Sequence, residues 1–187
     1  MPLRLPGRIF LGVLLALWIG LTGAWVQPAA AALTNNTYDG NIYALYAGNG
    51  SLVPPRGSLA QAMADHRPAA VIYYLDDDAA SKQFSPVVSE LQRLWGNRIE
   101  LIPLVTDPLQ NRATEDATDP AMYWSGVIPQ VVVFDSDGKV VFNASGLVDV
   151  DRINDGLSMA TGIPLSEGGT TSTTVSFNEL NAEVVSR

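Results

Sequence analysis

The segment AAVIYYLDDDAASKQFSP, residues 69–86, decides the fold that the sequence predicts. It opens with a continuous apolar and aromatic run over 69–75, which is typical of a strand covered on both faces of a sheet. Three consecutive aspartates, Asp76 to Asp78, end that run. Apolar residues then recur at helical spacing over 85–95. The segment therefore predicts a buried strand, an acidic turn and a helix, in that order.

The sequence on either side of this segment predicts the remaining elements of a mixed sheet. A second apolar run, and two alternating runs joined by Asp137-Gly138, are typical of strands. A capping box at Ser58 and the Asp119-Pro120 pair each predict a helix start. We expect strands at 99–105, 130–134 and 140–144, and helices at 59–66, 120–124 and 150–161. A βαβ unit followed by a ββα unit gives an α/β fold, a mixed four- to five-stranded sheet with helices on both faces.

This order of elements resembles thioredoxin, and the match extends to single residues. Thioredoxins carry a Cys-x-x-Cys-Lys motif after a buried strand and a proline inside the helix that follows. Without gaps, Asp78 and Ser81 stand at the two cysteine positions. Lys82 and Pro86 stand at the lysine and proline positions, and Pro129 stands where thioredoxins carry a cis-proline before a strand. The resemblance implies a thioredoxin-like fold.

The chain departs from thioredoxin in the residues that perform redox chemistry. It contains no cysteine, so it has no thiol for disulfide exchange, no disulfide and no thiolate metal site. Ile72 stands at the position of the buried carboxylate that moves protons in thioredoxins. These two independent losses indicate a scaffold kept without its redox chemistry. We therefore expect a protein that is not an enzyme, with no catalytic residue, no cofactor and no metal.

Composition narrows the classes of function further. The 187 residues carry a formal net charge of −8, and 47% of them are apolar. A chain of this length suits one medium domain with end segments. Nucleic-acid binding needs clustered basic residues, so the acidic balance argues against it. The single histidine, His66, excludes a multi-histidine metal centre.

The first 32 residues have the pattern of a signal peptide or an uncleaved signal anchor. Arg4 and Arg8 precede an apolar stretch over 9–26, and an alanine run at 29–32 offers a cleavage site. If the segment stays uncleaved, residues 9–26 contact the membrane. In either case we expect the rest of the chain to be exported.

Three further regions follow in the predicted organisation. Residues 33–55 form an N-terminal extension, rich in asparagine, glycine and proline, with an edge strand at 42–47. The thioredoxin-like domain occupies roughly 56–162. Glycine, serine and threonine dominate the start of the last segment, 163–187, which predicts a flexible tail.

Two longer stretches resemble a particular family of thioredoxin-like proteins. ALTNNTYDGNIYALYAGNGSLVPPR at 32–56 and VIPQVVVFDSDGKVVFNASG at 127–146 are similar to the cyanobacterial thylakoid membrane photosystem I accumulation factors. That resemblance implies a cysteine-free protein of the thylakoid membrane or lumen that supports photosystem I accumulation or assembly. Its implied partners are photosystem I subunits or assembly intermediates. The periplasm is the alternative location, and an exported domain that binds cations or peptides generally is the alternative function.

The acidic run Asp76, Asp77 and Asp78 is the most conspicuous candidate site. It lies at the carboxyl end of a central strand, where ligands bind in open α/β sheets. Adjacent carboxylates repel one another, and a bound Ca²⁺ or Mg²⁺ would relieve that repulsion. The favoured interpretation is a solvated loop with an aspartate N-cap.

The Ile128-Pro129 pair is the stronger candidate for function. In thioredoxin-like proteins the residue before the cis-proline offers its backbone to an extended partner chain, and that contact requires no cysteine. Tyr123 and Trp124 precede the pair, and either form an apolar wall for the partner or pack between helix and sheet. The predicted partner-binding residues are Asp76, Asp77, Asp78, Ser81, Tyr123, Trp124, Ile128 and Pro129.

Overall fold

A computed structural model describes residues 33–164 of the chain. The predicted leader and the tail beyond Pro164 lie outside the described residues. Within 33–164, no helix combines the length and apolar character that crossing a bilayer requires.

Four strands form one mixed sheet in the order β2-β1-β3-β4. Strand β1 (Ala69–Tyr74) lies parallel to β2 (Glu100–Val105) and antiparallel to β3 (Gln130–Phe134), which pairs antiparallel with β4 (Val140–Ser145). Every residue of β1 and β3 is buried, as the continuous apolar runs predict. The βαβ and ββα halves and this strand order confirm the thioredoxin-like α/β fold.

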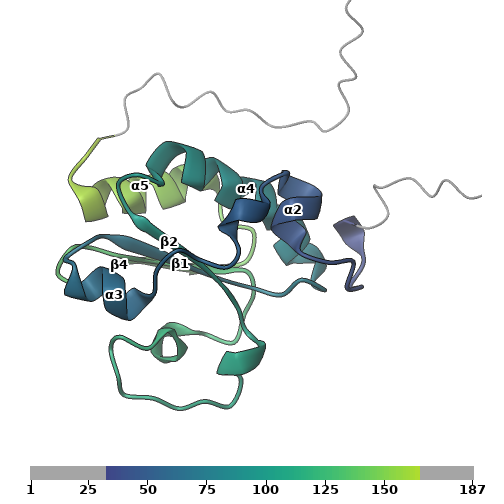
Figure 1. Cartoon of the computed structure of the whole chain (residues 1–187), viewed down its shortest axis with the longest axis horizontal. Helices are drawn as coiled ribbons and strands as arrows, with labels where there is room; N and C mark the ends of the chain where they lie inside the picture. Colours follow the sequence, from purple (N-terminus) through teal and green to yellow (C-terminus); the bar gives the residue numbers. More distant parts are fainter. Residues whose placement is uncertain (1–32, 165–187) are drawn as a thin grey trace, which may run out of the picture.

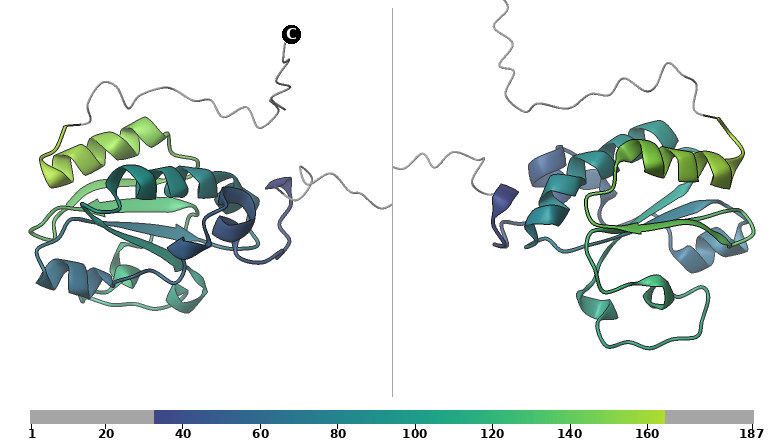
Figure 2. Two further views of the ribbon diagram at one scale, coloured as in Figure 1. Left: turned by 45° about the horizontal axis from the view of Figure 1, so that its top comes forward. Right: turned by 180° about the vertical axis from the view of Figure 1, so that it is seen from behind.

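Helices cover both faces of the sheet (Figures 1 and 2). One face carries α4 (Ala79–Trp95), α5 (Val150–Thr161) and the short α2 (Ile42–Ala47). The other carries α3 (Leu59–Ala64) and the long connection from β2 to β3, which holds only the 3-10 turns η3 (Asp107–Leu109) and η4 (Pro120–Tyr123). A further 3-10 turn, η2 (Gly50–Leu52), follows α2.

Strand β1 divides the core between these two layers. Its alternate side chains point to opposite faces, since successive residues of a strand do. Ala70, Ile72 and Tyr74 belong to the cluster beneath α4 and α5, which includes Trp95. Ala69, Val71 and Tyr73 belong to the cluster beneath α3, which includes Phe134.

Helix α4 starts earlier than the apolar spacing predicts, at Ala79. The Asp78 side chain caps it by accepting the Ser81 N–H at 2.7 Å, as the N-cap interpretation of the acidic run requires. Pro86 lies inside the helix and has no N–H for the carbonyl of Lys82. The Ser85 hydroxyl donates to that carbonyl at 2.8 Å instead, so the helix continues through the proline.

The predicted edge strand at 42–47 is wrong, because these residues form helix α2. The Asn41 side chain accepts the Ala44 N–H at 3.0 Å, and Gly48 ends the helix with a left-handed φ of 60°. Ile42 and Tyr43, which are neighbours in sequence, are both buried, which a half-buried strand does not allow. The sheet therefore has four strands and gains no fifth from the extension.

The boundaries of two short helices also differ from prediction. Helix α3 ends at Ala64 and not at His66, whose backbone has a left-handed φ of 51°. The predicted helix after Asp119 is a 3-10 turn of four residues, although Asp119 does cap it by accepting the Ala121 N–H. The strands at 130–134 and 140–144, the hairpin turn at Gly138 and the last helix are confirmed within one residue.

Gly156 permits α5 to approach strand β4 closely, and its replacement tests that packing. A Cβ at this position would lie 2.7 Å from the Cβ of Phe142. We expect Gly156→Ala to lower the free energy of unfolding by about 1–3 kcal/mol, because overpacking outweighs the helix propensity gained by alanine. Urea unfolding of the full chain in mild detergent, followed by near-ultraviolet circular dichroism, measures the change. Asp155→Ala, at an exposed position of the same helix, is the control. A Gly156→Ala variant as stable as the control contradicts this account of the packing.

Candidate functional site

The two halves of the predicted site lie at the same end of the sheet. Strands β1 and β3 are antiparallel, with Tyr73 opposite Gln130. The register therefore brings the residues before Gln130 beside the last residue of β1 and the acidic turn that follows it. The Ile128–Pro129 peptide bond is cis, as the thioredoxin resemblance implies, and Pro129 is buried.

The three aspartates serve different roles in this turn. An Asp76 carboxylate oxygen accepts the Ile42 N–H at 3.0 Å, which fixes the start of α2, whereas Asp78 caps α4. Burial raises the pKa of Asp76, the Ile42 N–H partly offsets this rise and the Asp77 charge adds to it. Asp77 alone is exposed. No group of three or more acidic or histidine side chains is placed to hold a metal ion anywhere in the described part of the chain.

Ser81 joins the turn to the helix and is not exposed to a partner. Its side chain is buried, with 1% of the residue accessible. Its hydroxyl accepts the Leu75 N–H at 3.3 Å, so it fixes the chain between β1 and α4. Ser81 is therefore a structural residue in this conformation.

Lys82 is the most unusual side chain at this end of the sheet, because its ammonium group is fully buried. It donates to the carbonyl of Thr37 at 2.5 Å, to an Asp39 carboxylate oxygen at 2.7 Å and to the main-chain and side-chain oxygens of Asn35 at 3.3 Å. The ring centroid of Tyr46 lies 5.7 Å from the ammonium nitrogen. Buried charges require such partners, and here nearly all come from one segment of the N-terminal extension.

That segment, residues 33–41, is called the strap below. Beyond the Lys82 contacts, Asn36 accepts the Ala79 N–H at 2.9 Å, and the Leu33 carbonyl accepts from the Gln83 amide at 3.3 Å. The strap thus covers the first turn of α4, the place where the thioredoxin resemblance puts its two cysteines (Figure 2). The extension and Lys82 are each recognisable in the sequence, but no local pattern connects them.

Gln130 holds the loop that leads into the cis peptide bond. Its amide, which is fully buried, donates to the Tyr123 carbonyl and to the Asn143 side chain, both at 2.9 Å. Its side-chain oxygen accepts the Ser125 N–H at 2.9 Å and the Ser125 hydroxyl at 3.1 Å. A glutamine inside a predicted strand gives no sign of these contacts. The sequence therefore did not predict that Gln130 fixes this loop.

Tyr123 and Trp124 pack against the sheet and do not form an exposed wall. The Tyr123 ring meets Phe134 edge to face at 4.8 Å, and its hydroxyl donates to the Ala117 carbonyl at 2.8 Å. Burial raises the pKa of the Tyr123 phenol, and the Asp116 charge adds to the rise. Trp124 packs against the same cluster, and its buried indole N–H has no acceptor among the described residues. The two aromatic residues therefore pack against the sheet as expected of a core position, although a 3-10 turn stands in place of the predicted helix.

An apolar surface remains open around the cis-proline. Val127 and Leu147 are 53% and 59% exposed, and Ile128 is half-buried against the core. Within residues 33–164, no hydrogen bond uses the backbone N–H or C=O of Val127 or Ile128. The Gly146 N–H donates to the Pro129 carbonyl at 2.7 Å, which keeps Leu147 close to this loop. We call Val127, Ile128 and Leu147 the cis-proline face.

A known protein resembles this chain over nearly its whole length. The chain is 36% identical to "Thylakoid membrane protein slr1796" of Synechocystis sp. (strain ATCC 27184 / PCC 6803 / Kazusa), an alignment that covers 95% of this chain and 93% of that protein. No family model matches the chain.

Two solved structures are similar to about half of the chain. The pneumococcal exposed lipoprotein thioredoxin Etrx1 of Streptococcus pneumoniae is 16% identical, with a TM-score of 0.43 over 54% of this chain and 89% of its own. A chain from a structural study of thiol resolution in yeast mitochondrial 1-Cys peroxiredoxin is 13% identical, with a TM-score of 0.40 over 54% of this chain and 85% of its own.

Lys82→Met tests whether the buried ammonium fixes the strap. Methionine keeps much of the volume but loses every hydrogen bond to residues 35–39, so we expect the free energy of unfolding to fall by about 2 kcal/mol. Amide hydrogen exchange over 33–46 should accelerate more than exchange in β1. Lys139→Met, at an exposed lysine of the β3–β4 hairpin, should leave both quantities unchanged. Unaltered exchange over 33–46 in Lys82→Met would show that other contacts fix the strap.

The Lys82–Asp39 pair also predicts a local pH dependence. The Lys82 ammonium, with help from the Tyr46 hydroxyl, lowers the pKa of Asp39 below its ordinary 3.8. A carboxyl whose pKa is lower in the folded state stabilises the fold above its unfolded pKa and loses that contribution as the pH falls. We expect the ring NMR signals of Tyr46, which donates to Asp39 at 2.8 Å, to shift as the pH drops below 3.8.

Asp39→Asn is the matched variant for this titration. Its Tyr46 signals should already be displaced at neutral pH and should not move further in the same interval. The readout has to be local, because the raised pKa of Asp76 contributes to global stability in the opposite sense. Identical titration curves for the two proteins would refute the assigned coupling.

Proposed function

This chain belongs to the family of the Synechocystis thylakoid membrane protein slr1796, and on that premise we propose a non-redox function in photosystem I accumulation or assembly. The protein would act in the thylakoid membrane or lumen by binding protein partners, not by catalysis. The photosystem I part rests on the similarity of segments 32–56 and 127–146 to the cyanobacterial accumulation factors. The proposed partners are photosystem I subunits or assembly intermediates.

Two observations support a role without redox chemistry. The sequence has no cysteine, so the chain itself supplies no thiolate for exchange. In addition, the strap occupies the first turn of α4, where a thioredoxin would present its reacting sulfur. A substrate of the thioredoxin kind would therefore meet the strap before it met Asp78 or Ser81.

One observation carries the proposed binding mode, which is the unpaired backbone of Val127 and Ile128. Free N–H and C=O groups on an extended segment are what a partner strand pairs with. The exposed side chains of Val127 and Leu147 flank these groups and provide apolar contact area. Gln130 and the buried Pro129 hold the loop in place, which reduces the entropy lost on binding.

The other predicted site residues contribute less to this proposal. Asp76, Asp78 and Ser81 have their side chains engaged within the fold, so Asp77 alone of the acidic turn faces a partner. This arrangement also disfavours the cation-binding alternative, since two of the three carboxylates are already occupied. An exported peptide-binding domain with no photosystem role remains the alternative that the next experiments distinguish.

Deleting the gene from its cyanobacterial host tests the biological half of the proposal. We expect the photosystem I content per chlorophyll to fall, measured by the photo-oxidation signal of its primary donor. Photosystem II content serves as the internal control. A deletion strain with unchanged photosystem I would refute the proposed role, while leaving the binding face to be tested separately.

Charge introduced on the cis-proline face tests the structural half. We expect Val127→Asp or Leu147→Asp in the full chain to lower the recovery of photosystem I subunits from solubilised thylakoids about tenfold, because charge in the centre of an apolar interface is costly. Met159→Asp, which alters an equally exposed apolar residue on α5, should not change recovery. Equal recovery by all four proteins, wild type included, would exclude this face as the contact.

A further inference from the structure

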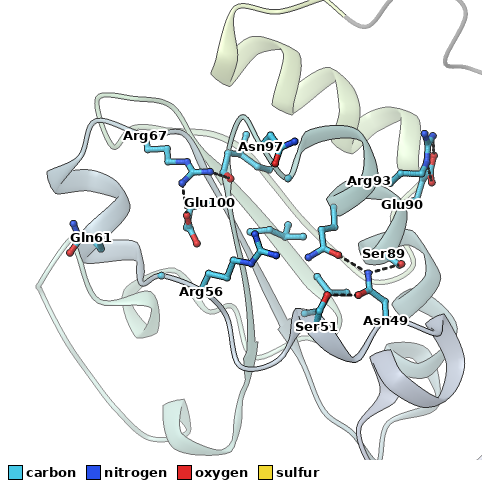
Figure 3. Close-up of a pocket in the computed structure, with 16 residues that line it drawn as sticks. Asn49, Ser51, Arg56, Gln61, Arg67, Ser89, Glu90, Arg93, Asn97 and Glu100 are labelled. Carbon is cyan, nitrogen blue, oxygen red and sulfur yellow. Dashed lines mark hydrogen bonds and ion pairs between the residues drawn. The ribbon is translucent and has the colours of Figure 1, made fainter.

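A groove lies beside the carboxyl-terminal half of α4, whereas the strap contacts the first turn of that helix. The groove has a volume of about 750 Å³ and lies between residues 49–57, the carboxyl-terminal half of α4 and the start of strand β2 (Figure 3). Its volume lies within the range of small-molecule sites in proteins. The cis-proline face contributes no residue to it.

The charge of this groove is opposite to that of the protein. Three arginines, Arg56, Arg67 and Arg93, line it with two glutamates, whereas the whole chain carries a net charge of −8. Arg67 pairs with Glu100 at 3.0 Å, and Arg93 forms two bonds with Glu90, at 2.7 and 2.5 Å. The opposite charges within each pair cancel, so the remaining arginine, Arg56, gives the groove its positive charge.

Arg56 has no ion-pair or hydrogen-bond partner among residues 33–164. Figure 3 draws its guanidinium in the midst of the lining side chains, with no dashed line to any of them. A guanidinium presents parallel N–H donors that match the two oxygens of a carboxylate. The free donors of Arg56 therefore suit a planar anion such as a carboxylate.

The edge of the sheet supplies a second kind of recognition beside Arg56. The Glu100 N–H donates to Pro68 and the Thr106 N–H donates to Tyr74, so the even-numbered residues of β2 face β1. The odd-numbered residues face away from the sheet, because parallel strands alternate in this way. Of these, Leu101 lines the groove, whereas Pro103 has no N–H to offer. The N–H and C=O of Leu101, a residue that is 9% exposed, are therefore the one backbone pair of β2 that points from the sheet edge towards the groove.

The walls of the groove are fixed by contacts that leave Arg56 free. The Asn49 amide donates to the Ser89 hydroxyl at 3.0 Å and to the Gln92 side chain at 2.6 Å, which ties the segment after α2 to α4. Gly57 lies so close to Glu100 that a Cβ there would be 3.0 Å from its carboxylate. The groove is thus formed before a ligand arrives.

We propose that this groove binds an acidic, extended segment of a partner protein. A glutamate or aspartate of the segment pairs with Arg56, and the neighbouring peptide unit bonds to the outward backbone of Leu101. An isolated anion would use only the first of these contacts, so the combination selects a peptide. This site is independent of the cis-proline face and of any photosystem role.

Fluorescence anisotropy of a labelled, end-blocked peptide of alternating valine and glutamate tests the proposal. The probe is titrated with the full chain in mild detergent, at one ionic strength, beside a peptide with glutamine in place of glutamate. We expect the glutamate peptide to bind about tenfold more tightly than the glutamine peptide. Arg56→Gln should abolish that difference, and Arg152→Gln, at an exposed arginine of α5 outside the groove, should preserve it.

Three results would overturn the proposal. The first is equal affinity of wild type and Arg56→Gln for the glutamate peptide. The second is displacement of the peptide by free glutarate at the same carboxylate concentration, which would make the groove a site for small anions. The third is Arg56-dependent binding of micelles that contain phosphatidylglycerol, with no binding of the peptide, which would make it a lipid headgroup site.

Discussion

The hydrogen bonds of the buried Lys82 ammonium are the contacts on which the conformation at the carboxyl end of β1 depends. A charge with no access to water needs oxygen ligands, and the backbone carbonyls of Asn35 and Thr37 with the Asp39 carboxylate supply them. Meeting that need fixes the strap over the first turn of α4. Part of the carboxyl end of β1 is thereby covered by the chain itself.

At this end of the sheet, the acidic turn lies beneath the strap, whereas the cis-proline loop lies outside it. Asp76, Asp78 and Ser81 satisfy backbone N–H groups of the turn and the two helix starts, so their polar atoms are already in use. The cis-proline loop, held from behind by Gln130, keeps unpaired backbone and apolar side chains at the surface. The polar atoms of the turn are therefore used within the fold, whereas the cis-proline loop keeps free backbone groups at the surface.

Local patterns predicted most of the fold, because each depends on neighbours in sequence. Continuous apolar runs marked β1 and β3, the Asp137-Gly138 pair marked the hairpin, and Asp78 marked a helix cap. The same reasoning failed for Ile42–Ala47, whose six residues suit either a short strand or a short helix. There the contact of Asp76 with Ile42, distant in sequence, accompanies the helical choice.

The sequence by itself determined the layered α/β architecture, the lack of a thiol and the cis bond at Ile128–Pro129, one of two cis prolines in the described residues, since hydrophobic periodicity, composition and spaced motifs are local properties. Only the tertiary structure decided that Lys82 would hold the strap, that Tyr123 and Trp124 would pack inward and that Arg56 would stand unpaired in a groove. Each of these depends on which side chains meet across long stretches of chain. Burial and hydrogen-bond partners are set by those meetings, and no spacing along the sequence records them.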